Sequence, residues 1–182
     1  MDVQKAIISR RTIHSFSQKQ ASEESIERAI QAANYAPCHR LTFPWRFTSL
    51  GREKRKLLFQ LALEIQSSGN QTNEKFKEKL SEKIINPSHL LVASQISADD
   101  PKLIKEDYAA CSCAIQNLML SLVSDGIGSK WSTGKLTTDK HTYKIVGINP
   151  IKEEIIGFIW IGYGDIPPTV NRPPLNSIFR RF

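Results

Sequence analysis

The fold of this chain begins with the stretch Ala6-Ile7-Ile8-Ser9-Arg10-Arg11-Thr12-Ile13-His14-Ser15-Phe16. Its first part has the apolar spacing of a short helix that ends near Ser9, and the chain then becomes extended. Two fixed cations beside a hydroxyl group and free backbone N–H groups suit a phosphate ester. The alternative is that Arg10 and Arg11 are a solvated pair favoured by the negative end of the helix dipole. The rest of the chain bears on which interpretation holds.

Length and composition are those of an ordinary globular protein. The chain has 182 residues, of which 40% are hydrophobic and 24% charged, so it can bury one sizeable core. We therefore expect a single domain over residues 1–182. The sequence contains no run of eighteen apolar residues, so we expect no transmembrane helix. The N-terminal segment becomes basic too soon for a signal peptide. Residence in the cytoplasm is the resulting expectation.

The net charge of +7 raises the alternative of a nucleic-acid-binding protein. The basic residues are scattered, however, and between Arg52 and Lys83 they alternate with acidic residues, which is typical of solvated helix faces. No DNA- or RNA-binding signature accompanies them. A small ligand that carries a phosphate explains a local basic cluster more simply, and we expect no nucleic-acid partner.

The three cysteines predict neither a disulfide framework nor a metal site. Cys111 and Cys113 fall in an expected helix, where residues i and i+2 point to different faces. Together with Cys38, they are expected to be small buried hydrophobic residues in a reducing compartment. We assign no redox role to Cys38.

The periodic segments predict a chain of mixed helices and strands. Ser22 caps a second helix, which Pro37 ends at Ala36. Further helices are expected over 57–65 and 102–125, strands over 44–50, 90–96, 127–131 and 154–162, and a loop over 131–134. Residues 68–86 are polar and weakly periodic, as expected of a variable or mobile insert over a site.

Two segments suggest contact between subunits. The expected helix 102–125 has unusually small residues in its middle, so it is either a central helix or a subunit seam. Residues 165–182 contain four prolines and end in Ile178, Phe179 and Phe182. These apolar side chains favour an extended arm that embraces a partner subunit over a disordered tail.

Several catalytic motifs are absent from the sequence. There is no phosphate-binding loop, no glycine-rich dinucleotide fingerprint between a strand and a helix, and no Gly-x-Ser-x-Gly. The four histidines show no metal-ligand spacing. Serine hydrolysis and metal catalysis are therefore poorly supported, and we assign no catalytic or metal-binding residue.

Five features occur in a characteristic order along the chain. They are the helix ending in Ser9-Arg10-Arg11-Thr12, the pair Ala36-Pro37, the segment Pro44-Trp45-Arg46-Phe47, the long helix of small residues, and residues 126–134 with the pattern Gly-x-Gly-Ser-x-Trp-Ser-Thr-Gly. This series resembles the nitroreductase family of FMN-dependent oxidoreductases, and within it the compact single-domain members. The likeness extends from residue 6 to about residue 174. It implies an α+β fold with a central, mostly antiparallel sheet flanked by helices.

The resemblance implies where FMN would bind. Arg10 and Arg11 match arginines that bind the FMN phosphate and ribityl chain, with the hydroxyl residue at Thr12 assisting. Tyr35 and His39 match residues that face the flavin from the partner subunit of a homodimer. For His39, a plain surface-loop position is an equal alternative.

The resemblance also assigns residues in the second half of the chain. Trp131, Ser132 and Thr133 match a stretch that runs along the isoalloxazine ring or the phosphate, and Arg172 matches a basic residue near the phosphate. Flavin chemistry is intrinsic to the cofactor, so the protein has only to bind, orient and tune it. This agrees with the absence of a protein nucleophile from the sequence.

Four positions depart from the family pattern. Leu41 and Phe43 stand where relatives have an Asn and a Gln that touch the flavin ring, and Tyr35 and Ser132 stand where an Arg is common. These differences bear on how tightly FMN binds. Cations that could compensate are Arg40, Lys130, Lys135 and Arg172.

The resemblance implies an enzyme that transfers hydride from NADH or NADPH to a nitroaromatic, a quinone or a similar small acceptor. The alternative is a flavin- or ligand-binding module of the same fold without significant reductase activity. Reduction of the bound flavin by a nicotinamide separates these two hypotheses.

Overall fold

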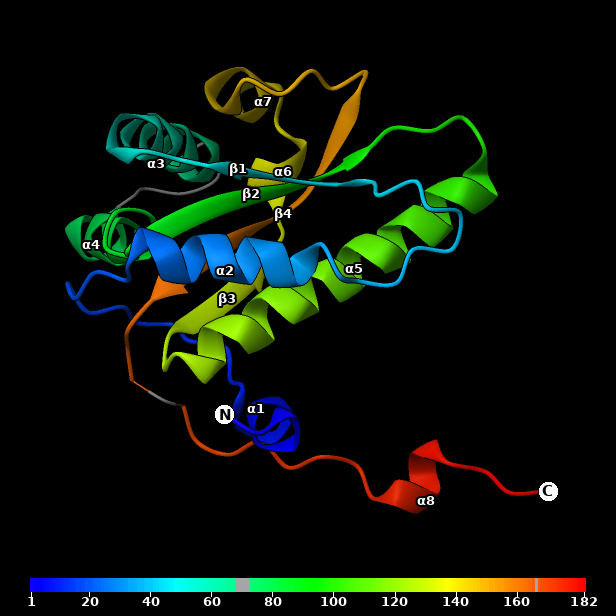
Figure 1. The fold of residues 1–182 in the computed structure, drawn as a ribbon. Helices are drawn as coiled ribbons and strands as arrows, with labels where there is room; N and C mark the ends of the chain where they lie inside the picture. Colours follow the sequence, from blue (N-terminus) through cyan, green and yellow to red (C-terminus); the bar gives the residue numbers. More distant parts are fainter. Residues whose placement is uncertain (68–72, 166) are drawn as a thin grey trace.

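The computed structural model describes residues 1–67, 73–165 and 167–182 (Figure 1). Its sheet contains four strands in the order β1-β2-β4-β3, and every neighbouring pair is antiparallel. The strands are β1 (Trp45–Ser49), β2 (His89–Ile96), β3 (Gly128–Ser132) and β4 (Glu153–Gly162). The helices of the described residues are α1 (Val3–Ser9), α2 (Glu23–Ala33), α3 (Arg52–Ser67), α4 (Glu74–Ile84), α5 (Pro101–Ser124), α6 (Lys135–Thr138), α7 (Lys140–Val146) and α8 (Leu175–Ile178). The predicted α+β class and antiparallel sheet are confirmed.

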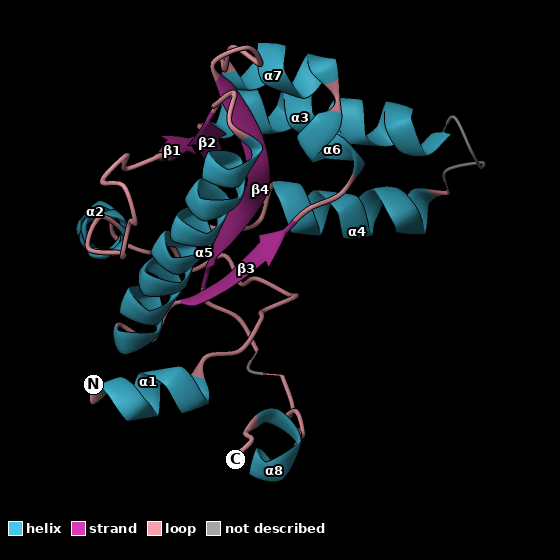
Figure 2. Cartoon of the chain, turned by 90° about the vertical axis from the view of Figure 1, so that its right-hand side faces the viewer, coloured by secondary structure: helices cyan, strands magenta, loops and turns pink. Residues whose placement is uncertain are grey.

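Both faces of the sheet are covered by helices, as Figure 2 shows. Side chains along a strand alternate between the two faces, and in β2 both sets are apolar. Leu91 and Ala93 belong to the core shared with α2 and α5. Leu90 and Val92 belong to the core on the other face, under α3, α4 and α7. The sheet is therefore the middle layer of three.

The small residues of α5 allow a close approach to a helix of the same chain. Ala110 and Ala114 of α5 are buried in one cluster with Ala29 and Ala33 of α2. The helix is thus central within its own chain, and its use as a subunit seam stays a prediction. The expectation of buried cysteines holds for Cys111 but is wrong for Cys113, which is exposed, and Cys38 is half-buried. Positions i and i+2 of a helix face different surroundings, which separates Cys111 from Cys113.

Most element boundaries lie within a residue of the expected ones, and the larger differences concern α2, α3 and α4. Helix α2 ends at Ala33, three residues before the expected end, and α3 is longer than 57–65 at both ends. Within the expected insert 68–86, α4 begins after Asn73, whose side chain accepts the Phe76 N–H at 2.9 Å. Residues 68–72 of that expected insert lie outside the described residues.

The C-terminal residues 167–182 leave the body of the molecule after β4 and carry the short helix α8 (Figure 1). Their large apolar side chains are exposed, with Ile178 at 70% and Phe182 fully accessible. The segment has the course of an arm with one helical turn, and its contact with a partner subunit stays a prediction. Within the described part of the chain, no helix is both long and apolar enough to cross a membrane.

Candidate functional site

The segment after α1 lies against the start of β3. The Arg10 N–H closes α1 by donating to the Ala6 carbonyl at 3.0 Å. Thr12 then pairs with Ser129 in a parallel bridge, and the Ile13 N–H donates to the Ser129 carbonyl at 3.1 Å. These contacts bring the arginines of the first motif to the edge of the strand that ends in Trp131 and Ser132.

A cluster of guanidinium groups forms at this edge. Burial lowers the pKa of Arg10, and repulsion from Arg172 and then from Arg11 lowers it further. In the described ranges, no carboxylate lies within ion-pair distance of any of the three, since none of the ion pairs found there includes them. A group of cations that repel one another and lack a counter-ion is suited to an anionic ligand.

Arg11 differs from Arg10 in its contacts. The Arg11 guanidinium donates to the Ile8 carbonyl at 2.6 Å and to the Arg10 carbonyl at 3.0 Å, which are the groups exposed at the end of α1. The helix-end interpretation of the sequence motif is therefore correct for Arg11. The Arg10 side chain makes no such bond among the described residues, and it carries the anion-binding interpretation.

Basic side chains continue along the sheet edge beyond the guanidinium cluster. The Nζ atom of Lys130 in β3 lies 3.3 Å from Nδ1 of His14. On the opposite side, burial lowers the pKa of Lys83 in α4, and the charge of Lys130 adds to the effect. The Lys83 ammonium lies 5.7 Å from the centre of the Trp160 ring. His14 and Lys83 were absent from the sequence prediction.

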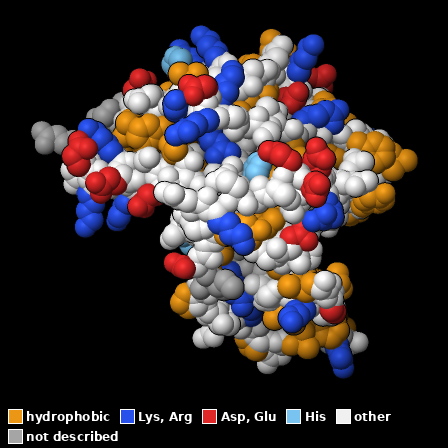
Figure 3. All heavy atoms as spheres, turned by 60° about the vertical axis from the view of Figure 1, so that its left-hand side comes forward, with side chains coloured by type: hydrophobic (Ala, Val, Ile, Leu, Met, Phe, Trp, Pro, Cys, Tyr) orange, Lys and Arg blue, Asp and Glu red, His pale blue; other side chains and the backbone are white. Residues whose placement is uncertain are grey.

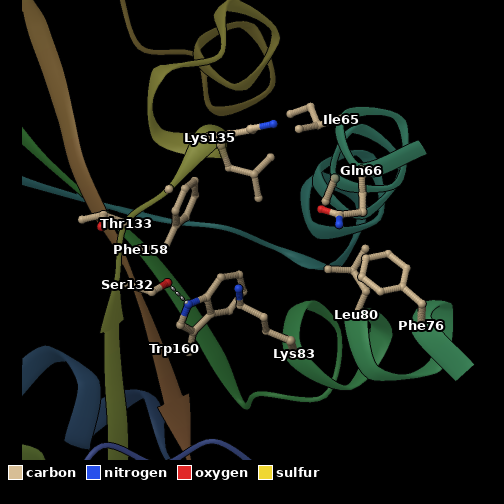
Figure 4. A pocket seen from close by; sticks show the side chains of 13 residues that line it. Ile65, Gln66, Phe76, Leu80, Lys83, Ser132, Thr133, Lys135, Phe158 and Trp160 are labelled. Carbon is tan, nitrogen blue, oxygen red and sulfur yellow. Dashed lines mark hydrogen bonds between the residues drawn. The ribbon is translucent and has the colours of Figure 1, made fainter. Parts of the chain in front are cut away.

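A pocket of about 340 Å³ opens at the far end of β3, between α3, α4 and α6 (Figure 4). Its apolar walls consist of Ala62, Ile65, Phe76, Leu80, Leu136, Phe158 and Trp160. Its polar residues are Gln66, Lys83, Ser132, Thr133 and Lys135, together with the backbone of Gly134. This size and mixture of walls suit a small organic ligand.

Trp131, Ser132 and Thr133 reach the pocket in different ways. Ser132 lies inside it, where its hydroxyl oxygen accepts the Trp160 indole N–H at 2.8 Å. Thr133 is exposed on the pocket wall. Trp131 points to the other face of the sheet and packs on the α2–α5 core. The loop expected over 131–134 begins only after Ser132, because Trp131 and Ser132 pair with β4 as strand residues.

Tyr35 and His39 are not brought to this site within one chain. Both lie in the connection between α2 and β1 and are exposed, Tyr35 to 80%. Neither contacts the guanidinium cluster or the pocket among the described residues. Their assignment to the cofactor of a partner subunit stays a prediction.

The same connection has an unusual backbone. Leu41 and Phe43 have φ angles of 54° and 45°, in the left-handed region that disfavours residues with a β-carbon. Both side chains are exposed. The Phe43 N–H donates to the Cys38 sulfur at 3.4 Å, which ties the loop together.

The four possible compensating cations have different positions. Lys130 and Arg172 join the basic edge described above, and Lys135 lines the pocket. Arg40 instead pairs with Glu106 at 3.2 Å, so that expectation is not supported for Arg40. Sequence reasoning could not single out Lys83, because its neighbourhood in α4 contains three other lysines.

One other arrangement resembles catalytic machinery. Ser88 Oγ lies 2.9 Å from His89 Nδ1, and His89 Nε2 lies 3.0 Å from Glu23 Oε1. Ser88 is buried, however, and its hydroxyl oxygen accepts the Ala21 N–H at 2.7 Å. This line of side chains therefore fastens the segment before α2 to β2. Among the described residues, no group of three or more metal-ligating side chains could hold an ion.

Comparison with known proteins bears on the family and the fold. The model of the Nitroreductase family matches residues 7–163. YfhC of Bacillus subtilis, named as a candidate NAD(P)H nitroreductase, is 35% identical over an alignment of 180 positions that covers 95% of this chain and 90% of YfhC.

Two solved structures have the same fold. A nitroreductase-like family protein from Bacillus cereus has a TM-score of 0.85 and 24% identity, covering 100% of this chain and 96% of the other. A nitroreductase from Desulfovibrio desulfuricans, solved in complex with FMN, has a TM-score of 0.77 and 16% identity over 100% of this chain and 97% of its own. The family match spans most of the chain, and the sequence relative and both folds agree with it. The chain belongs to the nitroreductase family.

Proposed function

We propose that this protein binds FMN and transfers hydride from NADH or NADPH to a nitroaromatic, a quinone or a similar small acceptor. One observation carries the proposal. A line of basic side chains without acidic partners in the described ranges runs along β3, from Arg10 and Arg172 to Lys130 and Lys83. It ends at a pocket with largely apolar walls. A ligand with an anionic tail joined to a flat ring would fit this arrangement, with the tail at the guanidinium cluster and the ring in the pocket.

The phosphate of FMN would occupy the guanidinium cluster. Arg10 and Arg172 can each donate two parallel hydrogen bonds to phosphate oxygens, and a phosphate would replace their repulsion with attraction. Thr12 supplies a hydroxyl donor beside them. Arg11 adds positive charge while its guanidinium holds the end of α1.

The pocket end of the site would hold the ring. When bound, FMN supplies the hydride chemistry by accepting a hydride and passing it on in a second binding event. Lys83 presents an ammonium group whose charge is already made costly by burial and Lys130, so it is suited to stabilise negative charge on a ligand. The apolar side chains of Phe158 and Trp160 line the pocket and would exclude water from the ring there. No residue has to act as a nucleophile.

The proposal includes a homodimer. The arm exposes Leu175, Ile178 and Phe179, and hydrophobic side chains gather on the projection that it forms with α1 (Figure 3). Strand β1 is an edge of the sheet in this chain and could pair with a partner segment. Light scattering would show a dimer for the full chain, and a variant that ends after residue 168 would dissociate. A monomeric full chain would contradict this part of the proposal.

The homodimer would also explain the exposed Tyr35 and His39. In a dimer they could reach the partner's flavin, as the family resemblance implies. The three free thiols agree with residence in a reducing compartment, and we infer the cytoplasm.

The visible spectrum of the purified protein tests the proposed function. We expect flavin absorption, release of FMN on denaturation, and bleaching of the flavin by NADH or NADPH without oxygen. Oxidised flavin should return when a quinone or a nitroaromatic compound is added. A protein that binds no FMN when reconstituted contradicts the whole proposal.

The second candidate function is a flavin-binding module without reductase activity. Leu41 and Phe43 favour it, because they place apolar side chains where family members have amide groups. Bound FMN that neither nicotinamide reduces would select this candidate.

A further inference from the structure

The pocket has two parts of different character. One part lies next to β3 and holds Ser132, Thr133 and Lys83, and the proposed function uses it for the flavin ring. The other part lies between α3, α4 and α6, across the pocket from β3 (Figure 4). Its walls are Ile65, Gln66, Phe76, Leu80, Lys135 and Leu136.

The second part combines an apolar interior with one cation at its edge. Phe76 and Leu80 of α4 and Ile65 of α3 supply the apolar surface. Lys135 begins α6, and its ammonium group points toward Ile65 across the gap between the two helices (Figure 4). No acidic side chain lines the pocket, and Lys135 forms no ion pair with any residue that the structure describes.

The geometry points to an aromatic acceptor that carries an anionic group, with Lys135 as the residue that selects it. This inference rests on the proposed function for its redox partner. The aromatic ring lies among Ile65, Phe76 and Leu80, and the carboxylate or sulfonate lies at the edge beside Lys135. Charge complementarity decides the class, because both lysines of the pocket are cationic and none of its lining residues is anionic.

The expected selectivity is moderate. Lys135 is exposed, so water screens its attraction to an anion and the pair resembles a surface ion pair. Apolar burial of the ring supplies the remaining affinity without regard to charge. We expect an anionic acceptor to be favoured about two- to fivefold over a neutral acceptor of the same shape.

Steady-state kinetics with 4-nitrobenzoate and 4-nitrobenzyl alcohol test this inference. The two acceptors differ in charge at the position opposite the nitro group. Lys135→Gln should lower the ratio of their kcat/KM values about two- to fivefold, and Lys135→Arg should restore it. The matched control is Lys140→Gln, an exposed lysine of α7 outside the pocket, which should leave the ratio unchanged. An unchanged ratio in Lys135→Gln overturns the inference.

A binding measurement separates this inference from the proposed function. Calorimetry with 2-naphthoate and 2-naphthamide, neither of which accepts hydride from a flavin, should show tighter binding of the naphthoate to the purified protein. Lys135→Gln should remove the difference. Equal binding of the two compounds to the unmodified protein overturns the inference even if the flavin is active, and a charge-dependent difference supports it even if no nicotinamide reduces the flavin.

Discussion

Gly157 of β4 packs against the indole ring of Trp131 in β3. A β-carbon at position 157 would overlap the indole nitrogen and come within 2.6 Å of Trp131 Cδ1. Next to this contact, the indole N–H donates to the Ile156 carbonyl at 3.4 Å, where β4 has an extra residue relative to β2. The end of β3 and the turn that carries the site therefore depend on the missing side chain.

Gly157→Ala should destabilise the protein by about 1–3 kcal/mol, because the methyl group has to displace a packed indole ring. Thermal unfolding would show a lower Tm. Gly51→Ala is the matched control, since a β-carbon there meets nothing within 4 Å. Equal Tm values for the two variants would show that Trp131 can move without cost.

Arg10→Ala should weaken FMN binding by about 1.5–3 kcal/mol, or roughly ten- to 150-fold, because it removes a charged donor without another partner. Arg172→Ala should act in the same direction. Fluorescence titration of FMN-free protein measures the effect. Arg28→Ala is the control, because the Arg28 guanidinium is already paired with the Asp125 carboxylate. Full FMN affinity in the Arg10→Ala/Arg172→Ala protein would show that the phosphate does not bind at the β3 edge of the sheet.

Arg11→Ala should lower the stability of α1 as well as FMN affinity. Its guanidinium holds the Ile8 and Arg10 carbonyls, and the loss of such bonds costs about 0.5–1.5 kcal/mol. The Tm of FMN-free protein should fall in Arg11→Ala and stay close to the original in Arg10→Ala. The reverse order would contradict the different contacts of the two arginines.

Lys83→Met should raise the Tm of FMN-free protein at neutral pH by about 1–3 °C. Burial, and then repulsion from Lys130, lowers the pKa of Lys83, so the unfolded chain holds its proton more tightly than the folded chain does. The resulting penalty is present below the folded pKa and declines as the pH rises toward about 10.4, the ordinary lysine value.

The increase in Tm that Lys83→Met produces should therefore become smaller in alkaline solution. Lys79→Met, at an exposed position of the same helix, is the control. A lower Tm for Lys83→Met at neutral pH would mean that the ammonium group stabilises the FMN-free fold.

Thiol labelling should distinguish Cys113 from Cys111. Burial, with Asp107 and Cys38 nearby, raises the pKa of Cys111 to about 12, so almost none of it is thiolate near neutral pH. A thiol reagent should modify the exposed Cys113 first, and Cys111 only after denaturation. Rapid modification of Cys111 in the native protein would contradict its placement between α5 and the sheet.

Local sequence determined much of this fold. The continuous apolar run of β2, the long helix of small residues and the cap at Ser22 each depend on neighbours in the chain, and all three appear in the structure. The order of the motifs was also sufficient to identify the family. The ends of the helices and strands were less predictable from the sequence. The end of α2 at Ala33 and the pairing of Trp131 with β4 both depend on packing.

Only the tertiary structure decided what each basic side chain does. Arg10 and Arg11 are adjacent in sequence, yet the Arg11 guanidinium holds the end of α1 while the Arg10 guanidinium faces the charges of Arg11 and Arg172. Lys83 lies in a helix with other lysines, and nothing local distinguishes it from them. It gains its role from Lys130 and Trp160, which lie more than forty residues away in the chain. Electrostatic roles depend on distance and burial, and those are properties of the folded chain.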